Sequence, residues 1–284
     1  MITIVFLSFH SEHHIRRHLL EIDIKFPIIV VDNSLNFQFK KEIEEQYKNV
    51  EVIIPDRNLG FAAGMNLGIK FSKTNYVFIN SPDVIISNNS IEKLVSKISL
   101  IDNFALLGPT YLDESVNKNY HELENCNNYK NLNLKEVKWI DNNFIINKSE
   151  INKIGFFDED FFMYYENFDL CYRILKNKKK MYVCSDIKFI HQGTNSTDQK
   201  FNLEVQLSKS WHYSWSKYFF FKKHYGIFFA LNKIIPNFIR SIKKIFYYNI
   251  LRKNKFKARL AAAELAGIIN AILCKSSNFR PFQN

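Results

Sequence analysis

The stretch Pro27-Ile-Ile-Val-Val-Asp-Asn-Ser34 carries the pattern that decides the fold, a short run of β-branched apolar residues that ends in polar ones. Similar runs occur before and after it, at Ile2–Leu7, Val50–Ile54 and Tyr76–Ile79. Runs of this length and composition are typical of strands that are buried on both faces. We therefore predict four buried strands in the first third of the chain.

Segments with helical periodicity separate these predicted strands. They are Glu12–Ile22, Phe39–Tyr47 and Ala62–Phe71. Strict alternation of strand and helix requires crossover connections between parallel strands, which place helices on both faces of one sheet. The sequence therefore predicts an α/β fold with a mainly parallel sheet.

Composition and cysteine content limit the class of protein. The 284 residues are 46% apolar and 24% charged, which is typical of a globular chain with a real core and excludes a disordered one. Four cysteines are too few and too irregularly spaced for a disulfide framework or a zinc site, so we expect reduced thiols in the cytosol. The N-terminus lacks the basic start and long apolar core of a signal peptide and is predicted to be the first strand.

The net charge of +11 is concentrated near the C-terminus. Residues 205–263 contain 13 Lys or Arg and no Asp or Glu. The chain has 39 basic residues in all, so the rest of it carries 39 − 13 = 26 basic and 28 acidic residues and is nearly neutral. We expect a domain at 1–203 followed by a basic, aromatic-rich helical extension at 204–284.

The basic residues recur too often in this extension for a helix that spans a bilayer. We therefore expect residues 205–263 to lie on an anionic membrane surface. The alternative is helices that pack on the rest of the chain with a solvated basic face. A nucleic-acid partner is not expected, because no nucleic-acid-binding motif accompanies the charge.

Two acidic residues directly follow predicted strands. Asp32 follows Ile28–Val31, and Asp83 follows the strand that begins at Tyr76. In open α/β sheets ligands bind at the carboxyl ends of the strands. Each residue alone could be a turn former, because Asp-Asn-Ser and Ser-Pro-Asp suit turns. Their shared level in the sheet favours a binding role.

The stretch Asn58–Gly68 places glycines every fourth residue, at Gly60, Gly64 and Gly68. This spacing differs from the dinucleotide-binding fingerprint. One interpretation is that these glycines form a helix face without side chains, which packs closely on the sheet. The other is that Gly60 begins a helix whose free amides, together with Asn58 and Asn66, face a polar or phosphate-bearing ligand.

Acidic and aromatic residues alternate through Ile154–Arg173. A carboxylate among apolar rings is costly unless it pairs with a cation or a metal or handles a proton, so this segment is a candidate catalytic region. A separate cluster of histidines lies near the first strand, at His10, His13, His14 and His18. We interpret it as a polar helix face rather than a metal site.

Five of these motifs, in this order, resemble those of family 2 glycosyltransferases, and the bacterial rhamnosyltransferase-like branch in particular. They are Val31–Ser34, Asn58–Gly68, Ser81–Asp83, Gly155–Arg173, and His191 before Ser196. The resemblance covers about residues 1 to 225 and implies a GT-A fold, a nucleotide-diphosphate-sugar donor, a divalent cation and inversion at the anomeric carbon. It suggests a cytoplasmic enzyme of bacterial surface polysaccharide synthesis, peripheral on the inner face of the cytoplasmic membrane, that acts on a lipid-linked glycan acceptor.

The resemblance also implies which residues bind the donor. By position, Asp32 would accept a hydrogen bond from the nucleotide base. The loop with Asn58, Gly60 and Asn66 would line the donor.

The metal motif of the family corresponds to Ser81–Asp83, and Asp83 would bind Mg²⁺ or Mn²⁺ with His191 as a further ligand. The family usually has Asn or Asp where Ser81 stands, so only Asp83 is expected as a ligand there. A hard dication prefers carboxylate and phosphate oxygens, and an added imidazole favours Mn²⁺.

The catalytic position departs from the family pattern. The family has Glu-Asp where this chain has Glu166-Asn167, and the Asp is the expected general base. An amide cannot accept the proton of the acceptor hydroxyl, so Glu166 could act instead. Asp169 is a weaker candidate, since its place in the pattern is usually structural. Alternatively the protein is a slow or silent donor-binding or scaffold partner. A nucleotidyltransferase is disfavoured, because the basic phosphate-binding signature expected near the first strand is missing.

Overall fold

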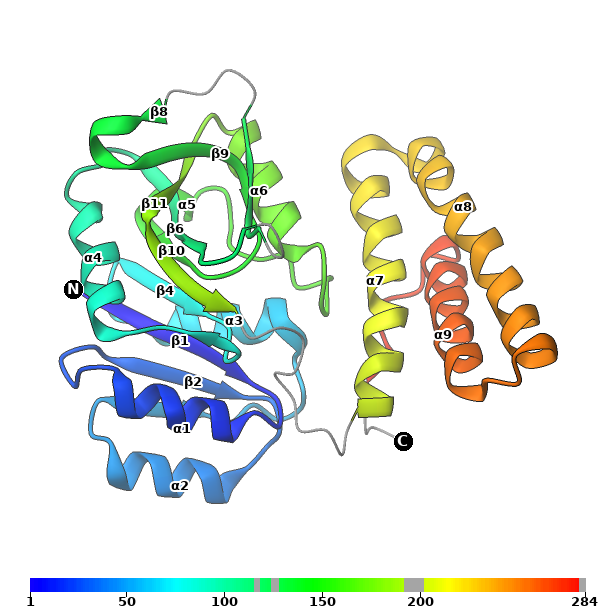
Figure 1. Cartoon of the computed structure of the whole chain (residues 1–284), viewed down its shortest axis with the longest axis horizontal. Coiled ribbons are helices and arrows are strands. Elements are labelled where there is room, and N and C mark those ends of the chain that lie inside the picture. Colours follow the sequence, from blue (N-terminus) through cyan, green and yellow to red (C-terminus); the bar gives the residue numbers. More distant parts are fainter. Residues whose placement is uncertain (115–117, 124–127, 192–201, 281–284) are drawn as a thin grey trace. The chain divides into compact units, whose positions relative to one another are not determined.

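The computed structural model describes residues 1–114, 118–123, 128–191 and 202–280, and divides the chain into two compact units (Figure 1). Within these ranges the first unit holds residues 1–158 and 167–191, and the second holds residues 159–166 and 202–280. Ser196, which belongs to the last motif of the resemblance, and Cys126 lie outside the described residues.

The first half of the sheet is parallel, as the sequence predicts. Its strands are β1 (Ile2–Ser8), β2 (Ile28–Asp32), β3 (Val50–Ile53) and β4 (Tyr76–Asn80), in the order β3-β2-β1-β4. The register pairs Ile4 with Ile28 and with Phe78. All four predicted strands are therefore confirmed, and their carboxyl ends lie at one edge.

The second half of the sheet is mixed. Strand β10 (Phe144–Asn147) runs antiparallel between β4 and β6 (Phe104–Tyr111), and β11 (Lys180–His191) runs parallel to β6. The remaining strands are β5 (Val84–Ile85), β7 (Tyr120–Glu122), β8 (Asn128–Tyr129) and β9 (Leu134–Ile140). Because β10 is antiparallel, the residues that precede it lie at the same edge as the carboxyl ends of β4 and β6.

Helices cover both faces of this sheet. One face packs on α1 (Glu12–Glu21), α2 (Phe37–Gln46) and α4 (Asn88–Ile98), and the other on α3 (Gly60–Phe71), α5 (Lys148–Ile151) and α6 (Glu166–Lys176). A short 3₁₀ helix, η1 (Lys130–Leu132), precedes β9. Alternate residues of β1 enter opposite cores, which is the period-two pattern of a buried strand. The predicted α/β class is confirmed.

The glycine stripe of α3 has the packing role. A Cβ atom at Gly64 would lie 2.5 Å from Leu7 Cδ1, and one at Gly68 would lie 2.5 Å from Val5 Cγ1. These distances are too short for any larger residue, so the glycines let α3 approach β1 closely. Gly60 begins the helix with φ of +77°, a conformation that glycine adopts readily.

The second unit contains three long helices, α7 (Asn202–Tyr225), α8 (Ile227–Phe246) and α9 (Lys255–Ile272), with a π-helical turn η3 (Tyr247–Leu251) after α8. They pack around Trp211, Trp215 and Ile234. Gly226, with φ of +87°, separates α7 from α8. No helix among the described residues is long and apolar enough to cross a membrane.

The division of the chain differs from the expected boundary at residues 203 and 204, because residues 159–166 also belong to the second unit. Aromatic contacts explain this placement: Phe161 packs edge-on against Phe219, and Tyr164 against Tyr213. The Ser216 hydroxyl also donates a 2.9 Å hydrogen bond to the carbonyl oxygen of Met163. Part of the acidic and aromatic motif is therefore packed with the C-terminal helices.

Candidate active site

Strand pairing brings Asp83 and His191 together. The short strand β5 pairs antiparallel with the end of β11, with Val84 opposite His191, so the preceding Asp83 lies beside the imidazole. His191 Nε2 and Asp83 Oδ2 are 3.4 Å apart, and both side chains are mostly buried. These two residues, far apart in sequence, are the pair that the resemblance implies as metal ligands.

Buried amides hold the turn that carries Asp83. The Asn80 side chain donates to the carbonyl oxygens of Ser81 and Val84, at 3.1 and 3.3 Å. Asn143 donates to Asn80 Oδ1, and Tyr111 donates a 2.9 Å hydrogen bond to Asn143 Oδ1. This network joins β4, β6 and the loop before β10. It fixes the Ser81–Asp83 turn without using the Asp83 carboxylate.

His18 supports the same turn from α1. Its Nε2 lies 2.9 Å from the carbonyl oxygen of Pro82, and its ring stacks on Phe6 with centroids 4.9 Å apart. Burial lowers the pKa of His18 to about 4, so the ring is neutral near pH 7 and Nε2–H donates to Pro82. The interpretation of the histidine cluster as a polar helix face is wrong for His18, because this side chain is buried.

Asp141 and Tyr111 add to the surroundings of His191. The Tyr111 ring stacks on the imidazole with centroids 5.3 Å apart and planes 9° apart. Burial raises the pKa of the Asp141 carboxyl, and the attraction of His191 opposes that shift. No three His, Cys, Asp or Glu side chains among the described residues are grouped so that they could hold a metal ion. Asp83 and His191 would therefore need oxygen ligands from a bound molecule.

The sequence analysis did not identify Asn80, Asp141 or Asn143 as site residues. A signal was present, because Asp141–Asn143 is a polar triplet directly before a strongly apolar strand. Its significance depends on β10 being antiparallel, which places the start of that strand at the carboxyl edge. Local sequence gives no direct indication of strand direction.

Asp32 ends β2 as predicted and is completely buried. Its carboxylate accepts hydrogen bonds from the backbone amides of Ser34 and Asn36, at 3.2 and 2.8 Å. Burial raises the pKa of the Asp32 carboxyl, while the two amides oppose the shift. The turn-forming role that the sequence left open is therefore visible in the structure.

The polar side chains around α3 are engaged with backbone. Asn58 Oδ1 accepts a 2.9 Å hydrogen bond from the backbone amide of Gly60. Asn33 accepts a hydrogen bond from the backbone amide of Leu59 and donates one to the carbonyl oxygen of Gly60. Asn66 donates to the carbonyl of Phe157 at 2.9 Å and accepts its amide at 3.1 Å. Asn58 and Asn66 therefore hold the loops on either side of α3, and their contact with a ligand stays a prediction.

Glu166 and Asn167 begin α6, and each is only 5% exposed. Asn167 Nδ2 donates a 3.3 Å hydrogen bond to Asn142 Oδ1, which ties the start of α6 to the Asp141–Asn143 loop. Asn167 Oδ1 is buried and has no hydrogen-bond partner in the described part of the chain. A buried acceptor without a donor is costly, so this oxygen is suited to a hydroxyl from a ligand.

Asp169 has a structural contact rather than an open carboxylate. It is completely buried and accepts a 2.7 Å hydrogen bond from Arg173 Nε. Arg173 also donates to the carbonyls of Ile154 and Gly155 at 3.0 and 2.7 Å, and to that of Phe156. Asp169 thus orients the arginine that holds the preceding loop, which is the structural role usual for its place in the motif, and a catalytic role for it stays a prediction.

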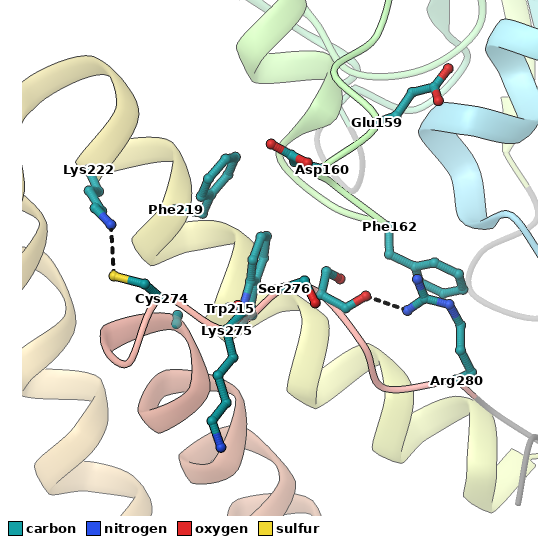
Figure 2. A pocket seen from close by; sticks show the side chains of 12 residues that line it. Glu159, Asp160, Phe162, Trp215, Phe219, Lys222, Cys274, Lys275, Ser276 and Arg280 are labelled. Carbon is teal, nitrogen blue, oxygen red and sulfur yellow. Dashed lines mark hydrogen bonds between the residues drawn. The ribbon is translucent and has the colours of Figure 1, made fainter.

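The second unit has a pocket of about 380 Å³ that combines aromatic rings with charged groups of both signs (Figure 2). Trp215 donates its indole N–H to the Lys275 carbonyl at 2.9 Å and stacks on Phe219. The Arg280 guanidinium lies 3.9 Å from the centre of the Phe162 ring. Rigid aromatic faces beside charged hydrogen-bonding groups suit a sugar ring, because its C–H face packs on the rings and its hydroxyls bond the charges.

Comparisons with known proteins agree with the geometry. Residues 17–173, more than half of the chain, match the family described as glycosyl transferase family 2. The chain is 25% identical over 224 residues to the low-salt glycan biosynthesis hexosyltransferase Agl10 of Haloferax volcanii, covering 72% of each chain. It is 27% identical over 179 residues to the dTDP-rhamnosyl transferase RfbF of Shigella flexneri, covering 58% of this chain and 59% of that one.

Solved structures support the fold. The mannosyltransferase PcManGT from Pyrobaculum calidifontis, in complex with GDP-Man and Mn²⁺, superimposes with a TM-score of 0.57 at 11% identity, covering 97% of this chain and 88% of that chain. Identity this low supports the GT-A fold alone. The family match rests on the sequence of residues 17–173, which contains the Asp32, Asp83 and Glu166–Arg173 motifs. The chain belongs to glycosyl transferase family 2.

Proposed function

We propose that the protein is an inverting glycosyltransferase that moves a hexose or deoxyhexose from a nucleotide-diphosphate donor to a lipid-linked glycan acceptor in surface polysaccharide synthesis. It would act in the cytoplasm as a peripheral protein at the inner face of the cytoplasmic membrane. The observation that carries this proposal is the Asp83–His191 pair at the carboxyl edge of the sheet. The names of the relatives, a glycan biosynthesis hexosyltransferase and a dTDP-rhamnosyl transferase, support the reaction class.

The donor is proposed to lie across the carboxyl ends of β1, β2 and β4. The base would meet the loop after Asp32, whose shape the buried carboxylate fixes through Ser34 and Asn36. The remaining donor contacts would come from the Asn58–Gly60 loop and from Ser81. Because parallel strands end together here, the three loops lie at one edge.

Asp83 and His191 would hold Mn²⁺ or Mg²⁺. The residues fit such an ion, because a carboxylate oxygen and an imidazole nitrogen already lie 3.4 Å apart. The oxygens of the donor diphosphate would complete the coordination. A bound dication supplies positive charge that stabilises the departing diphosphate.

Glu166 is proposed as the general base. The acceptor oxygen forms a bond to the anomeric carbon while the bond from that carbon to the diphosphate oxygen breaks, and the hydroxyl proton passes to the Glu166 carboxylate. A single displacement of this kind inverts the anomeric configuration. Asn167 cannot take the proton, but its unpaired Oδ1 would accept a hydrogen bond from a second, non-reacting hydroxyl of the acceptor sugar and so orient that sugar.

The pocket of the second unit is proposed to bind a sugar of the glycan acceptor. Its Phe219 ring, which is only partly buried, would pack on the sugar, and Asp160 and Arg280 would bond its hydroxyls. Replacing Phe219 with Leu should raise the KM for the acceptor and leave the KM for the donor unchanged.

A second candidate function is a silent donor-binding partner of an active transferase, and Asn167 in place of the family's Asp favours it. The two functions differ in the response to Asn167→Asp. If this substitution raises turnover from near zero, the natural chain is silent. If Glu166→Gln abolishes a robust activity, Glu166 is the base.

The test is a screen of the purified protein against UDP-, dTDP- and GDP-sugars, with and without Mn²⁺, that records thermal stability and nucleoside diphosphate release. We expect metal-dependent stabilisation by one nucleotide class together with release. Asp83→Asn should lose both responses, and the exposed Asp102→Asn is the matched control that should keep them. Stabilisation without release in the presence of a glycolipid acceptor would favour the silent partner. No response to any nucleotide class would contradict the proposal.

A further inference from the structure

Helix α8 presents its largest apolar side chains to solvent. Phe228, Ile235, Ile239, Ile242 and Phe246 recur at spacings of seven, four, three and four residues, which places them on one side of an α-helix. All five are exposed, from 44% for Ile242 to 86% for Phe228. We call these five residues the outer stripe.

The opposite side of α8 makes the contacts with α7 and α9. Its buried residues are Ala230, Ile234, Asn237 and Ser241, of which only Ile234 is a large apolar residue. Asn237 accepts a 3.0 Å hydrogen bond from Lys217 of α7. Leu231 and Phe238 also pack against this core, partly buried, so α8 carries large apolar residues on both sides and its own bundle uses only one of them. An exposed apolar stripe of this length is typical of an interaction surface.

Basic residues flank the outer stripe. Lys233, Arg240 and Lys243 are exposed on α8, and Arg252 and Lys253 follow η3. The turn between them adds Ile250 and Leu251, which are 55% and 72% exposed. No acidic residue occurs in residues 205–263. Glu264 pairs with Arg240 and Lys244 at 3.1 and 3.5 Å, so Lys233, Lys243, Arg252 and Lys253 supply the net positive charge beside the apolar groups.

This combination identifies the partner by its chemistry. We propose that the outer stripe enters the headgroup region of an anionic lipid bilayer, with α8 lying along the surface. The 20 residues of α8 extend about 30 Å, enough to insert all five side chains from one face. The basic residues would then lie level with the lipid phosphates. A second copy of the chain fits less well, because two such surfaces would bring their basic residues together, and the adjacent Glu264 already pairs with Arg240 and Lys244.

This inference specifies how the transferase would be held at the membrane, and it rests on the proposed function. The surface would hold the enzyme where a lipid-linked acceptor lies. The experiment is flotation of the full chain with two kinds of vesicle. One is phosphatidylcholine alone, and the other contains about 25% phosphatidylglycerol, which supplies anionic headgroups. We expect binding to the anionic vesicles, weakened by added salt.

The test variant is Ile235→Ser/Ile239→Ser/Ile242→Ser, and we expect its partition coefficient to fall about 100-fold. The matched control is Leu20→Ser/Ile24→Ser/Leu100→Ser, which removes three exposed apolar residues from the first unit and should bind vesicles as the natural chain does. Circular dichroism of both variants checks that the helices are retained.

Three outcomes would overturn the proposal. The first is unchanged vesicle binding by the outer-stripe variant, and the second is equal binding of the natural chain to neutral and anionic vesicles. The third is that light scattering shows a dimer of the natural chain and a monomer of the outer-stripe variant, while neither protein binds vesicles. Donor binding separates this proposal from the proposed function. Nucleotide-dependent thermal stabilisation should be the same in the natural chain and the outer-stripe variant, and its absence in both would count against the transferase alone.

Discussion

The carboxyl edge of the first unit and the outer stripe of α8 depart in opposite ways from the usual distribution of polar and apolar residues. At the edge, Asp32, Asn80 and Asn143 are buried polar groups, held by hydrogen bonds to each other or to backbone. On α8, large apolar side chains such as Phe228 are exposed in the described part of the chain. Burying polar groups and exposing apolar ones both cost stability, so both regions are where function is expected.

The two regions also differ in how they can be tested. The edge is a precise arrangement in which single atoms matter, whereas the outer stripe is a surface in which total apolar area and charge matter. Single substitutions should therefore have large effects at the edge and small ones on α8. The predictions below use that contrast, beginning with the largest expected effect.

Asp83→Asn should lower kcat/KM by about 10⁴-fold or more, because the amide removes the anionic ligand of the proposed dication. The measurement is nucleoside diphosphate release at saturating Mn²⁺. Ser81→Ala should have a much smaller effect, since Ser81 is not expected to be a ligand. Equal effects of the two substitutions would remove the special role of Asp83.

Glu166→Gln should lower kcat by about 10² to 10⁴-fold and leave donor binding unchanged, because only proton transfer is lost. Steady-state rates with saturating acceptor and calorimetric donor binding provide the comparison. A normal rate for Glu166→Gln would eliminate this residue as the base.

Arg173→Met should destabilise the first unit by about 3 to 5 kcal/mol, because Asp169 would remain as a buried carboxylate without its partner. Urea unfolding at pH 7 measures this change. Adding Asp169→Asn should recover part of the loss, since the unpaired charge is then removed. No recovery in the double variant would contradict the positioning role of Asp169.

His18 should make stability depend on pH. Because its pKa is about 4 in the folded state and 6.5 in the reference state, the unfolded chain binds more protons below pH 6.5. Its contribution is therefore complete above pH 6.5 and decreases as the pH falls towards 4. We expect a loss of about 2 kcal/mol between pH 7 and pH 5. His18→Gln, which keeps a donor for Pro82, should show a smaller loss in urea titrations at the two pH values.

The sequence predicts the parallel strands and the positions of Asp32 and Asp83 well, because buried strands and the turns after them have local signals. It also identified His191, through the ordered motifs. The buried support of the site was not predictable in the same way. His18 reaches Pro82, and Tyr111 reaches Asn143, through contacts that depend on the packing of distant elements.

The C-terminal helices show a related limit. Periodicity indicates that α8 is amphipathic, but it does not indicate which side packs on α7 and α9. Large apolar residues occur on both sides, and the structure packs the side with Ile234 and Phe238 while the outer stripe stays exposed. Likewise, the aromatic residues of 159–166 read as part of the catalytic motif, and only the structure groups them with α7.

Asp83 and His191 are proposed to bind a nucleotide diphosphate through a dication. Calorimetric titration of UDP, dTDP and GDP into the natural chain and the Asp83→Asn variant, with and without Mn²⁺, tests this directly. We expect one nucleotide to bind the natural chain tightly only with Mn²⁺, and Asp83→Asn to abolish the effect of the metal. Equal nucleotide binding by the two proteins, or binding unaffected by Mn²⁺, would contradict it.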